Sequence, residues 1–268
     1  MPPSPAVSTA TADAASADIG AQSSRERYIG LIWLVSAAFF MQALDSTIVN
    51  TAVPAIASAL NETPLNMRSA LTSYVLTLAI LIPASPWLCD RFGTRRVFAM
   101  AIGTFVVGSF LCGVSQTLPE LVLARVLQGC GGAALMPVGR YVLVRSIDKR
   151  DFVQVMSTVA TFGLLGSVLG PLLGGALVQY TSWRLIFLIN VPVGIVGLWL
   201  NHREMPEYRL DRANRFDLFG FLLFAASSAL LLAASEFAAD ENIRWVEMGS
   251  LVVLAVLLHS PISGIAVA

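Results

Sequence analysis

The stretch YIGLIWLVSAAFFMQALDSTIVN, residues 28–50, decides the fold class of this chain. Its first seventeen residues carry no charge, and Asp45 follows them. A helix that crosses a bilayer needs about 20 mostly apolar residues, so we predict a membrane-spanning helix here. A charged side chain at the bilayer centre costs about 2.5–3.5 kcal/mol on insertion scales. Asp45 therefore requires a structural or a functional reason.

The composition extends this interpretation to the whole chain. Of its 268 residues, 56% are hydrophobic and 13% are charged, and the mean hydropathy is +0.73. Soluble domains contain about 25% charged residues, so we predict an all-α polytopic membrane protein. The net charge is zero and indicates no nucleic-acid partner. The cysteines are scattered and have no CxxC pattern, so we expect neither a zinc site nor a disulfide framework.

Eight stretches are long and apolar enough to span a membrane. They are roughly 28–50, 69–89, 97–117, 120–140, 152–178, 185–201, 218–236 and 247–265. We expect residues 1–27 to form a disordered cytoplasmic tail and residues 28–201 to form a six-helix bundle. A cytoplasmic loop would follow at 202–217, and two additional transmembrane helices would lie within 218–268.

The distribution of basic residues predicts the orientation. If the N-terminus is cytoplasmic, most of the 17 lysines and arginines fall in inner segments, and the outer segments hold Arg68, Arg184 and Arg244. An excess of Lys and Arg marks the cytoplasmic side. We therefore expect a multi-pass protein of the cell inner (plasma) membrane with its N-terminus in the cytoplasm.

Two ionisable residues, Asp45 and Arg125, fall well inside predicted spans. At a helix rise of about 1.5 Å per residue they lie roughly 26 Å and 22 Å from the inner surface. Similar depths allow the two charges to pair. One interpretation is a structural ion pair. The other is a carboxylate in a wet cavity, whose proton or cationic ligand takes part in transport. The two are not exclusive.

Small residues form a stripe on the fifth predicted span. Gly166, Gly170 and Gly174 recur every fourth residue in GLLGSVLGPLLGG (163–175), and Pro171 removes a backbone donor among them. Small residues let neighbouring helices approach closely in a membrane. The stripe predicts close packing with a kink, which is also compatible with a gating helix.

Six stretches together resemble the major facilitator superfamily, and within it the fourteen-span drug:proton antiporters. In order they are LDSTIVNTAVPAI (44–56), LCDRFGTRR (88–96), LARVLQGCGGAALMP (123–137), GSVLGPLLGG (166–175), WRLIFLINVPVG (183–194) and RFDLFG (215–220). The resemblance implies an N-terminal six-helix bundle followed by two additional helices, with the C-terminal bundle absent. The chain stops at HSPISGIAVA, where the family would continue. We expect a truncated product, with assembly of half-molecules as the alternative.

The resemblance also implies residue roles. Asp45 and Arg125 would serve proton or substrate coupling. The cytoplasmic gate motif would consist of Asp90, Arg91, Gly93, Arg95 and Arg96. The antiporter hinge would consist of Gly166, Gly170, Pro171, Gly174 and Gly175. One departure is Pro86, which stands where the family's loop motif usually has glycine, and its fixed φ would loosen the closed gate.

The expected function is a proton-coupled efflux antiporter of small hydrophobic or cationic compounds. We expect no cofactor, because protons are the coupling ion. The expected partners are a small-molecule substrate, the lipid bilayer and a missing C-terminal half. No G-x-x-x-x-G-K-[ST], G-x-S-x-G or H-E-x-x-H motif occurs, so neither ATP-driven transport nor a hydrolase is favoured. The alternative is a non-transporting membrane fragment with a binding or scaffolding role.

Overall fold

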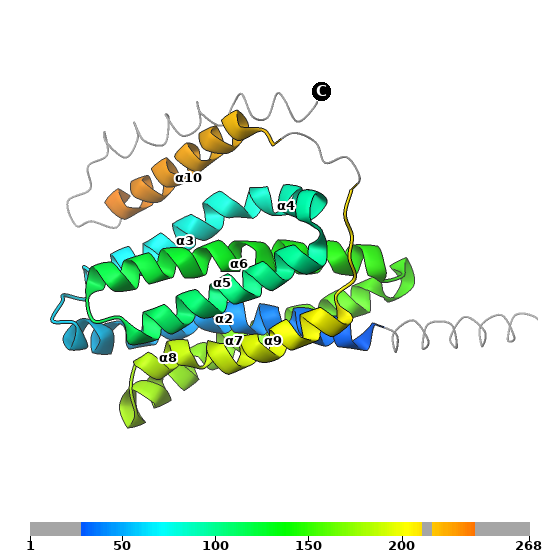
Figure 1. Cartoon of the computed structure of the whole chain (residues 1–268). Helices are drawn as coiled ribbons and strands as arrows, with labels where there is room; N and C mark the ends of the chain where they lie inside the picture. Colours follow the sequence, from blue (N-terminus) through cyan, green and yellow to red (C-terminus); the bar gives the residue numbers. More distant parts are fainter. Residues whose placement is uncertain (1–27, 211–215, 239–268) are drawn as a thin grey trace, which may run out of the picture.

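The computed structural model describes residues 28–210 and 216–238, and these residues form helices, turns and loops without a strand (Figure 1). The elements in chain order are α2 (Ile29–Ala59), α3 (Arg68–Leu81), the 3₁₀ turn η1 (Ile82–Ala84), α4 (Ser85–Phe92), α5 (Thr94–Val114), α6 (Leu118–Ser146), α7 (Lys149–Tyr180), α8 (Arg184–Leu188), α9 (Asn190–Glu204) and α10 (Leu218–Ala238).

Six helical stretches in the described part are long and apolar enough to cross a membrane. They are α2, the α3–α4 unit, α5, α6, α7 and the α8–α9 unit. The predicted all-α, multi-pass membrane architecture is thus confirmed. The predicted seventh span coincides with α10. The predicted eighth span, 247–265, and the predicted tail, 1–27, lie outside the described residues.

Several helices extend beyond the predicted spans, and α2 does so most. The prediction ended its span at residue 50, whereas α2 continues to Ala59 with Pro54 inside it. Proline removes one helical hydrogen bond, but Ile56 and Ala57 beyond it are 0% and 1% exposed. Tertiary packing therefore holds the helix past Pro54. Hydropathy marks the part of a helix that lipid surrounds, which need not include its ends.

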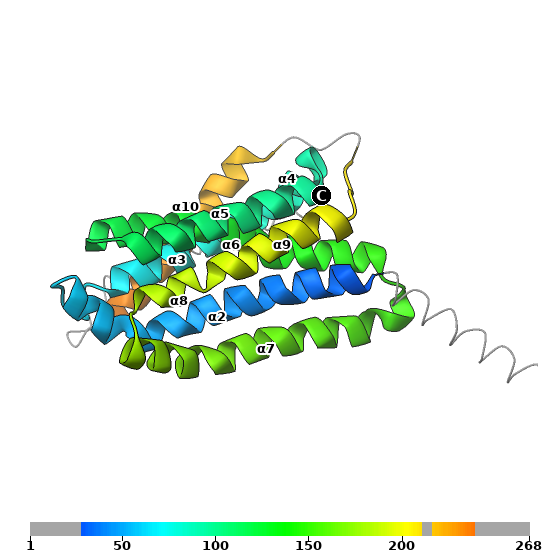
Figure 2. The same cartoon turned by 60° about the horizontal axis from the view of Figure 1, so that its bottom comes forward.

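The bundle is arranged around α2, which packs between α7 and α9 and also contacts α6 (Figure 2). On the other side, α6 packs against both α3 and α5. The α10 helix lies along α3 (Figure 1). This arrangement brings α2, α5, α6 and α9 to one interior, although they are far apart in the chain.

The buried apolar side chains form two clusters that follow each other along α2. The first takes α2 residues from Leu31 to Met41, and the second takes α2 residues from Leu44 to Ala57. Asp45 lies at the boundary between the two clusters. The carboxylate is therefore placed between two apolar layers and away from both helix ends.

Candidate functional site

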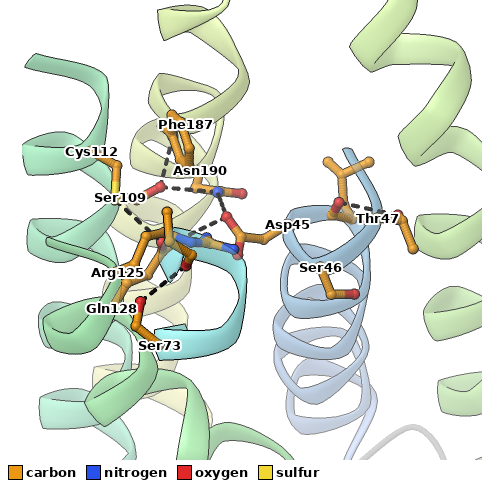
Figure 3. Close-up of polar contacts among 12 residues, drawn as sticks. Asp45, Ser46, Thr47, Ser73, Ser109, Cys112, Arg125, Gln128, Phe187 and Asn190 are labelled. Atoms are coloured by element: carbon orange, nitrogen blue, oxygen red, sulfur yellow. Dashed lines mark hydrogen bonds and ion pairs between the residues drawn. The ribbon is translucent and has the colours of Figure 1, made fainter. Parts of the chain in front are cut away.

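Asp45 is fully buried, at 0% exposure, and its carboxylate points from α2 toward α6 (Figure 3). Its Oδ2 accepts a hydrogen bond from Arg125 Nη1 at 2.8 Å. Arg125 is itself 2% exposed. The depth comparison allowed this pairing, and the structure contains it. A lone charge in this position would carry a large desolvation penalty, which the opposite charge offsets.

Gln128 joins the pair from one turn further along α6. Its Nε2 donates to Asp45 Oδ1 at 2.8 Å, and its Oε1 accepts from Arg125 Nη1 at 2.8 Å. The same Oε1 lies 3.6 Å from Cys112 Sγ on α5. Because Oε1 is occupied by donors, the amide nitrogen must face the carboxylate. The close approach that permits this depends on Gly108 of α5, where a Cβ would lie 2.5 Å from Gln128 N.

Asn190 reaches the same carboxylate from the start of α9. Its Nδ2 donates to Asp45 Oδ1 at 3.2 Å and to Ser109 Oγ at 3.0 Å (Figure 3). Ser109 Oγ in turn donates to the Phe187 carbonyl at 2.9 Å. We call Asp45, Arg125, Gln128, Asn190, Ser109 and Cys112 the buried network.

The position of Asn190 follows from a break in the sixth span. Pro192 has no N–H to donate to the carbonyl of Leu188, four residues earlier, so this helical hydrogen bond is missing. Helix α8 ends at Leu188, and α9 begins at Asn190. Ile189 between them keeps right-handed helical angles, φ −61° and ψ −27°. The interruption is therefore local, and it occurs where the helix meets Asp45.

Aromatic rings cover the Arg125 guanidinium. Its Cζ lies 4.2 Å from the centroid of the Tyr74 ring and 5.6 Å from that of Phe187. A cation over an aromatic face is attracted to the ring, more strongly when water is excluded. The cation is thus held by a carboxylate, an amide oxygen and two rings. No group of residues suited to hold a metal ion occurs in the described part of the chain.

A second polar region lies at the end of the bundle where α4 turns into α5. Gly93 makes this turn with φ +88°, a left-handed conformation that glycine adopts without strain. Asp90 Oδ1 accepts from the Tyr141 hydroxyl at 3.3 Å. Arg145 lies 4.9 Å from the Tyr141 ring centroid and 5.7 Å from that of Tyr208.

The segment 205–210, which follows α9, pairs with this turn. Thr94 N donates to the Tyr208 carbonyl at 3.1 Å, and Tyr208 N donates to Thr94 Oγ1 at 2.9 Å. Thr94 Oγ1 also donates to the Pro206 carbonyl at 2.7 Å. Leu210 N donates to the Asp90 carbonyl at 3.3 Å. The chain after the sixth span is therefore fastened to the turn between the second and third spans.

The predicted gate residues take different positions in this region. Arg95 donates to the His202 carbonyl, and its own carbonyl accepts from Asn201 Nδ2 at 3.1 Å. Arg91 and Arg96 are exposed. We call Asp90, Thr94, Arg95, Tyr141, Arg145 and Tyr208 the loop-motif cluster. Their role in gating stays a prediction.

The predicted hinge glycines form the contact between α7 and α2. A Cβ at Gly170 would lie 2.0 Å from Thr47 Oγ1, and one at Gly174 would lie 2.2 Å from Thr51 Oγ1. Gly166 meets the carbonyl of Phe40, where a Cβ would come within 2.6 Å. Pro171 is exposed, and Gly175 faces away from this contact with open space beside it. The stripe packs closely, and its role as a hinge stays a prediction.

The prediction missed several members of the buried network. Gln128, Asn190 and Ser109 are neutral, and the search for intramembrane charges passed over them. Gln128 stands three residues after Arg125, which places the two on one helix face. Asn190 is a polar residue within the apolar run LIFLINVPVG (185–194). These signals were available, but nothing in the sequence indicated that Asn190 meets Asp45.

Comparison with known proteins agrees with this architecture. The family model described as Major Facilitator Superfamily matches residues 35–267. The candidate multidrug resistance protein MdtD of Citrobacter koseri is 47% identical over 226 residues, which cover 84% of this chain and 48% of that protein. The Salmonella typhi protein of the same name is 51% identical over 203 residues, covering 76% and 43%. The chain spans about half the length of the curated relatives it matches.

Solved structures share the fold at low sequence identity. A bacterial homologue of the human lysosomal transporter Spinster, inward-facing and unoccupied, superposes with a TM-score of 0.57 at 18% identity, covering 87% of this chain and 55% of that chain. The POT family transporter PepTSo gives a TM-score of 0.62 at 14% identity, covering 87% and 52%. Helix order, the family match and these likenesses lead to one conclusion: the chain belongs to the major facilitator superfamily.

Proposed function

We propose that this chain forms part of a proton-coupled efflux antiporter, with Asp45 as the group that carries the proton. The observation that supports this most is the buried Asp45–Arg125 pair at 2.8 Å, between two apolar layers of the bundle. Ionisable residues inside membrane spans commonly belong to ion or substrate pathways. The buried pair is neutral overall while Asp45 is ionised, and it carries a net positive charge once Asp45 is protonated.

The proposed cycle uses the difference between those states. With Asp45 ionised, the carboxylate and the guanidinium compensate each other. When Asp45 takes up a proton, Arg125 loses its counterion. The conformation in which Arg125 packs beside Asp45 then becomes less favourable. A ligand or proton that interacts differently with two conformations shifts their populations. A membrane potential of 100 mV supplies about 2.3 kcal/mol for each charge moved.

We propose small hydrophobic or cationic compounds as the substrates; the MdtD relatives are named as multidrug resistance proteins. We further propose the inner (plasma) membrane as the location and a cytoplasmic N-terminus, from the distribution of arginines. Under this orientation the loop-motif cluster lies on the cytoplasmic side, where Asp90, Arg91, Gly93, Arg95 and Arg96 serve as a gate. The proposed partner is the C-terminal half of such a transporter.

The test is transport by the reconstituted 268-residue chain. Efflux of a fluorescent lipophilic cation should exceed that from empty vesicles and should stop when an uncoupler collapses the proton gradient. Asp45→Asn should abolish the efflux or make it independent of the pH gradient. The matched control is Glu120→Gln, which removes an exposed carboxylate at the start of α6. Unchanged, gradient-driven efflux in Asp45→Asn would remove Asp45 from the mechanism.

A second candidate is a membrane fragment with a binding or scaffolding role and no transport of its own. Its binding surface would be the apolar face of α7, where Val153, Val168 and Leu172 are 71%, 71% and 68% exposed and can be covered by lipid or by a partner. Efflux no greater than that from empty vesicles, from a chain that is folded and inserted, would favour this candidate over the first.

A further inference from the structure

We propose that Asn190 is a positioning residue that holds Asp45 in its ionised, Arg125-paired form, so that the sixth span takes part in the protonation step. This inference rests on the proposed role of Asp45 as the proton carrier. The carboxylate accepts three hydrogen bonds, from Arg125 at Oδ2 and from Gln128 and Asn190 at Oδ1. An ionised aspartate is an acceptor only, and hydrogen bonds to the charged form favour that form.

The orientation of the Asn190 amide is fixed by its other partner. Ser109 uses its single hydroxyl hydrogen to donate to the Phe187 carbonyl, so its oxygen can only accept from Asn190. The Asn190 NH₂ group therefore faces Ser109 and uses its second hydrogen on Asp45. The carbonyl of α8 and the hydroxyl of α5 thus determine which end of the amide meets the carboxylate.

Protonation of Asp45 disturbs these hydrogen bonds. A protonated Oδ1 meets two donors, the amides of Gln128 and Asn190, and has no acceptor among them. Gln128 cannot easily turn over, because its Oε1 already accepts from Arg125 and faces Cys112. Turning over Asn190 breaks its bond with Ser109, at the break in the sixth span. Proton uptake is therefore linked to a change between α5 and the α8–α9 junction.

The other groups around Asp45 lie on helices other than the sixth span. Among the described residues, the titratable side chains near Asp45 are Arg125 on α6, Tyr74 on α3 and Cys112 on α5. Helix α7 meets α2 near Asp45 through Gly166 and Gly170, and α9 contributes Asn190. Asn190 is thus the contact through which the sixth span acts on the carboxylate in the described structure.

The experiment follows the protonation of Asp45 directly in the purified, full 268-residue chain. The chain is labelled with ¹³C at aspartate, and pH-difference infrared spectra are recorded; the signal that disappears in Asp45→Asn belongs to Asp45. In Asn190→Ala the midpoint of this titration should move up by about one pH unit, a tenfold gain in proton affinity, as expected for one lost hydrogen bond to a charged group. Ser109→Ala should give a smaller shift in the same direction.

The matched control is Asn201→Ala. Asn201 lies on the same helix about three turns after Asn190, is 2% exposed, and donates to the Arg95 carbonyl. Its removal should leave the Asp45 titration unchanged, so a general loosening of α9 is distinguished from loss of the Asn190 contact. If Asn190→Ala does not fold, Ser109→Ala decides, because it keeps the Asn190 amide and removes the hydroxyl that fixes the orientation of that amide.

An Asp45 titration that is the same in the wild-type chain, Asn190→Ala and Ser109→Ala would overturn the inference. A shift of equal size in Asn201→Ala would overturn it as well. These outcomes do not depend on transport, so they leave the proposed function standing. Absence of any titration of Asp45 over the pH range in which the chain is folded would instead contradict the proposed function and this inference together.

Discussion

The buried network and the loop-motif cluster each contain a central aspartate, and the two aspartates are satisfied in different ways. Asp45 is 0% exposed and is bound by an arginine and two amides. Asp90 is half-buried, and it meets a tyrosine hydroxyl through its carboxylate and the Leu210 amide through its carbonyl. Inside the bundle, charge must be compensated by protein. At its end, the contacts with the 205–210 segment come from backbone groups and from the Thr94 hydroxyl.

The largest expected effect comes from breaking the buried pair. Arg125→Ala leaves the Asp45 charge without a counterion, and we expect the free energy of unfolding to fall by about 3–5 kcal/mol. Denaturant titration in detergent measures this loss. Arg203→Ala is the control, because Arg203 is exposed and its guanidinium lies 5.1 Å from the Trp199 ring centroid. Its removal should lower the free energy of unfolding by about 0.5–1 kcal/mol.

The double variant Asp45→Asn with Arg125→Leu sharpens this test. Removing both charges leaves neither of them buried alone, so the double variant should be more stable than Arg125→Ala. If the double variant is the less stable of the two, compensation of charge is not what the pair contributes.

Thr94→Val breaks the loop-motif cluster while preserving the shape of the side chain. The change leaves the Pro206 carbonyl and the Tyr208 amide without their side-chain partner, and we expect a loss of about 1–3 kcal/mol. Hydrogen exchange should rise in the 205–210 segment and stay unchanged around Asp45. Thr161→Val is the control, since that exposed hydroxyl bonds only to the Ser157 carbonyl of its own helix. A faster exchange at Asp45 as well would show that the two regions are one unit.

The smallest expected effect is that of Tyr141→Phe. It removes the hydroxyl that donates to Asp90 at 3.3 Å and keeps the ring that lies against Arg145. Because the site is half-buried and water can replace the hydroxyl, we expect a loss of about 0.5 kcal/mol by thermal denaturation. A loss as large as that of Thr94→Val would mean that the side chain of Asp90, and not the backbone pairing, holds this region together.

The same contrast explains what could be predicted from the sequence. Hydropathy predicts membrane spans because burial in lipid requires apolar residues, and the depth of Asp45 and Arg125 follows from the helix rise. Hydropathy does not place the end of α2, because the chain stays apolar to Leu60 and Pro54 is compatible with either a kink or an end; the packing beyond Pro54 decides it. Asn190 carries no charge, so its contact with Asp45 depends on how α9 packs. Thr94 pairs with Tyr208 through its backbone amide and its hydroxyl, and neither group carries a charge that would mark the contact in the sequence.

The sixth span completes both regions, and this affects when they can form during synthesis. Asn190 follows its partner Asp45 by 145 residues, and Tyr208 follows Thr94 by 114. At about 5–20 residues per second, a ribosome needs roughly 6–30 s to add the missing partner. For that time Asp45 has at most the partners on earlier helices, and the turn at Gly93 has none from the 205–210 segment. The six-helix bundle is thus closed by its sixth span and by the 205–210 segment that follows it.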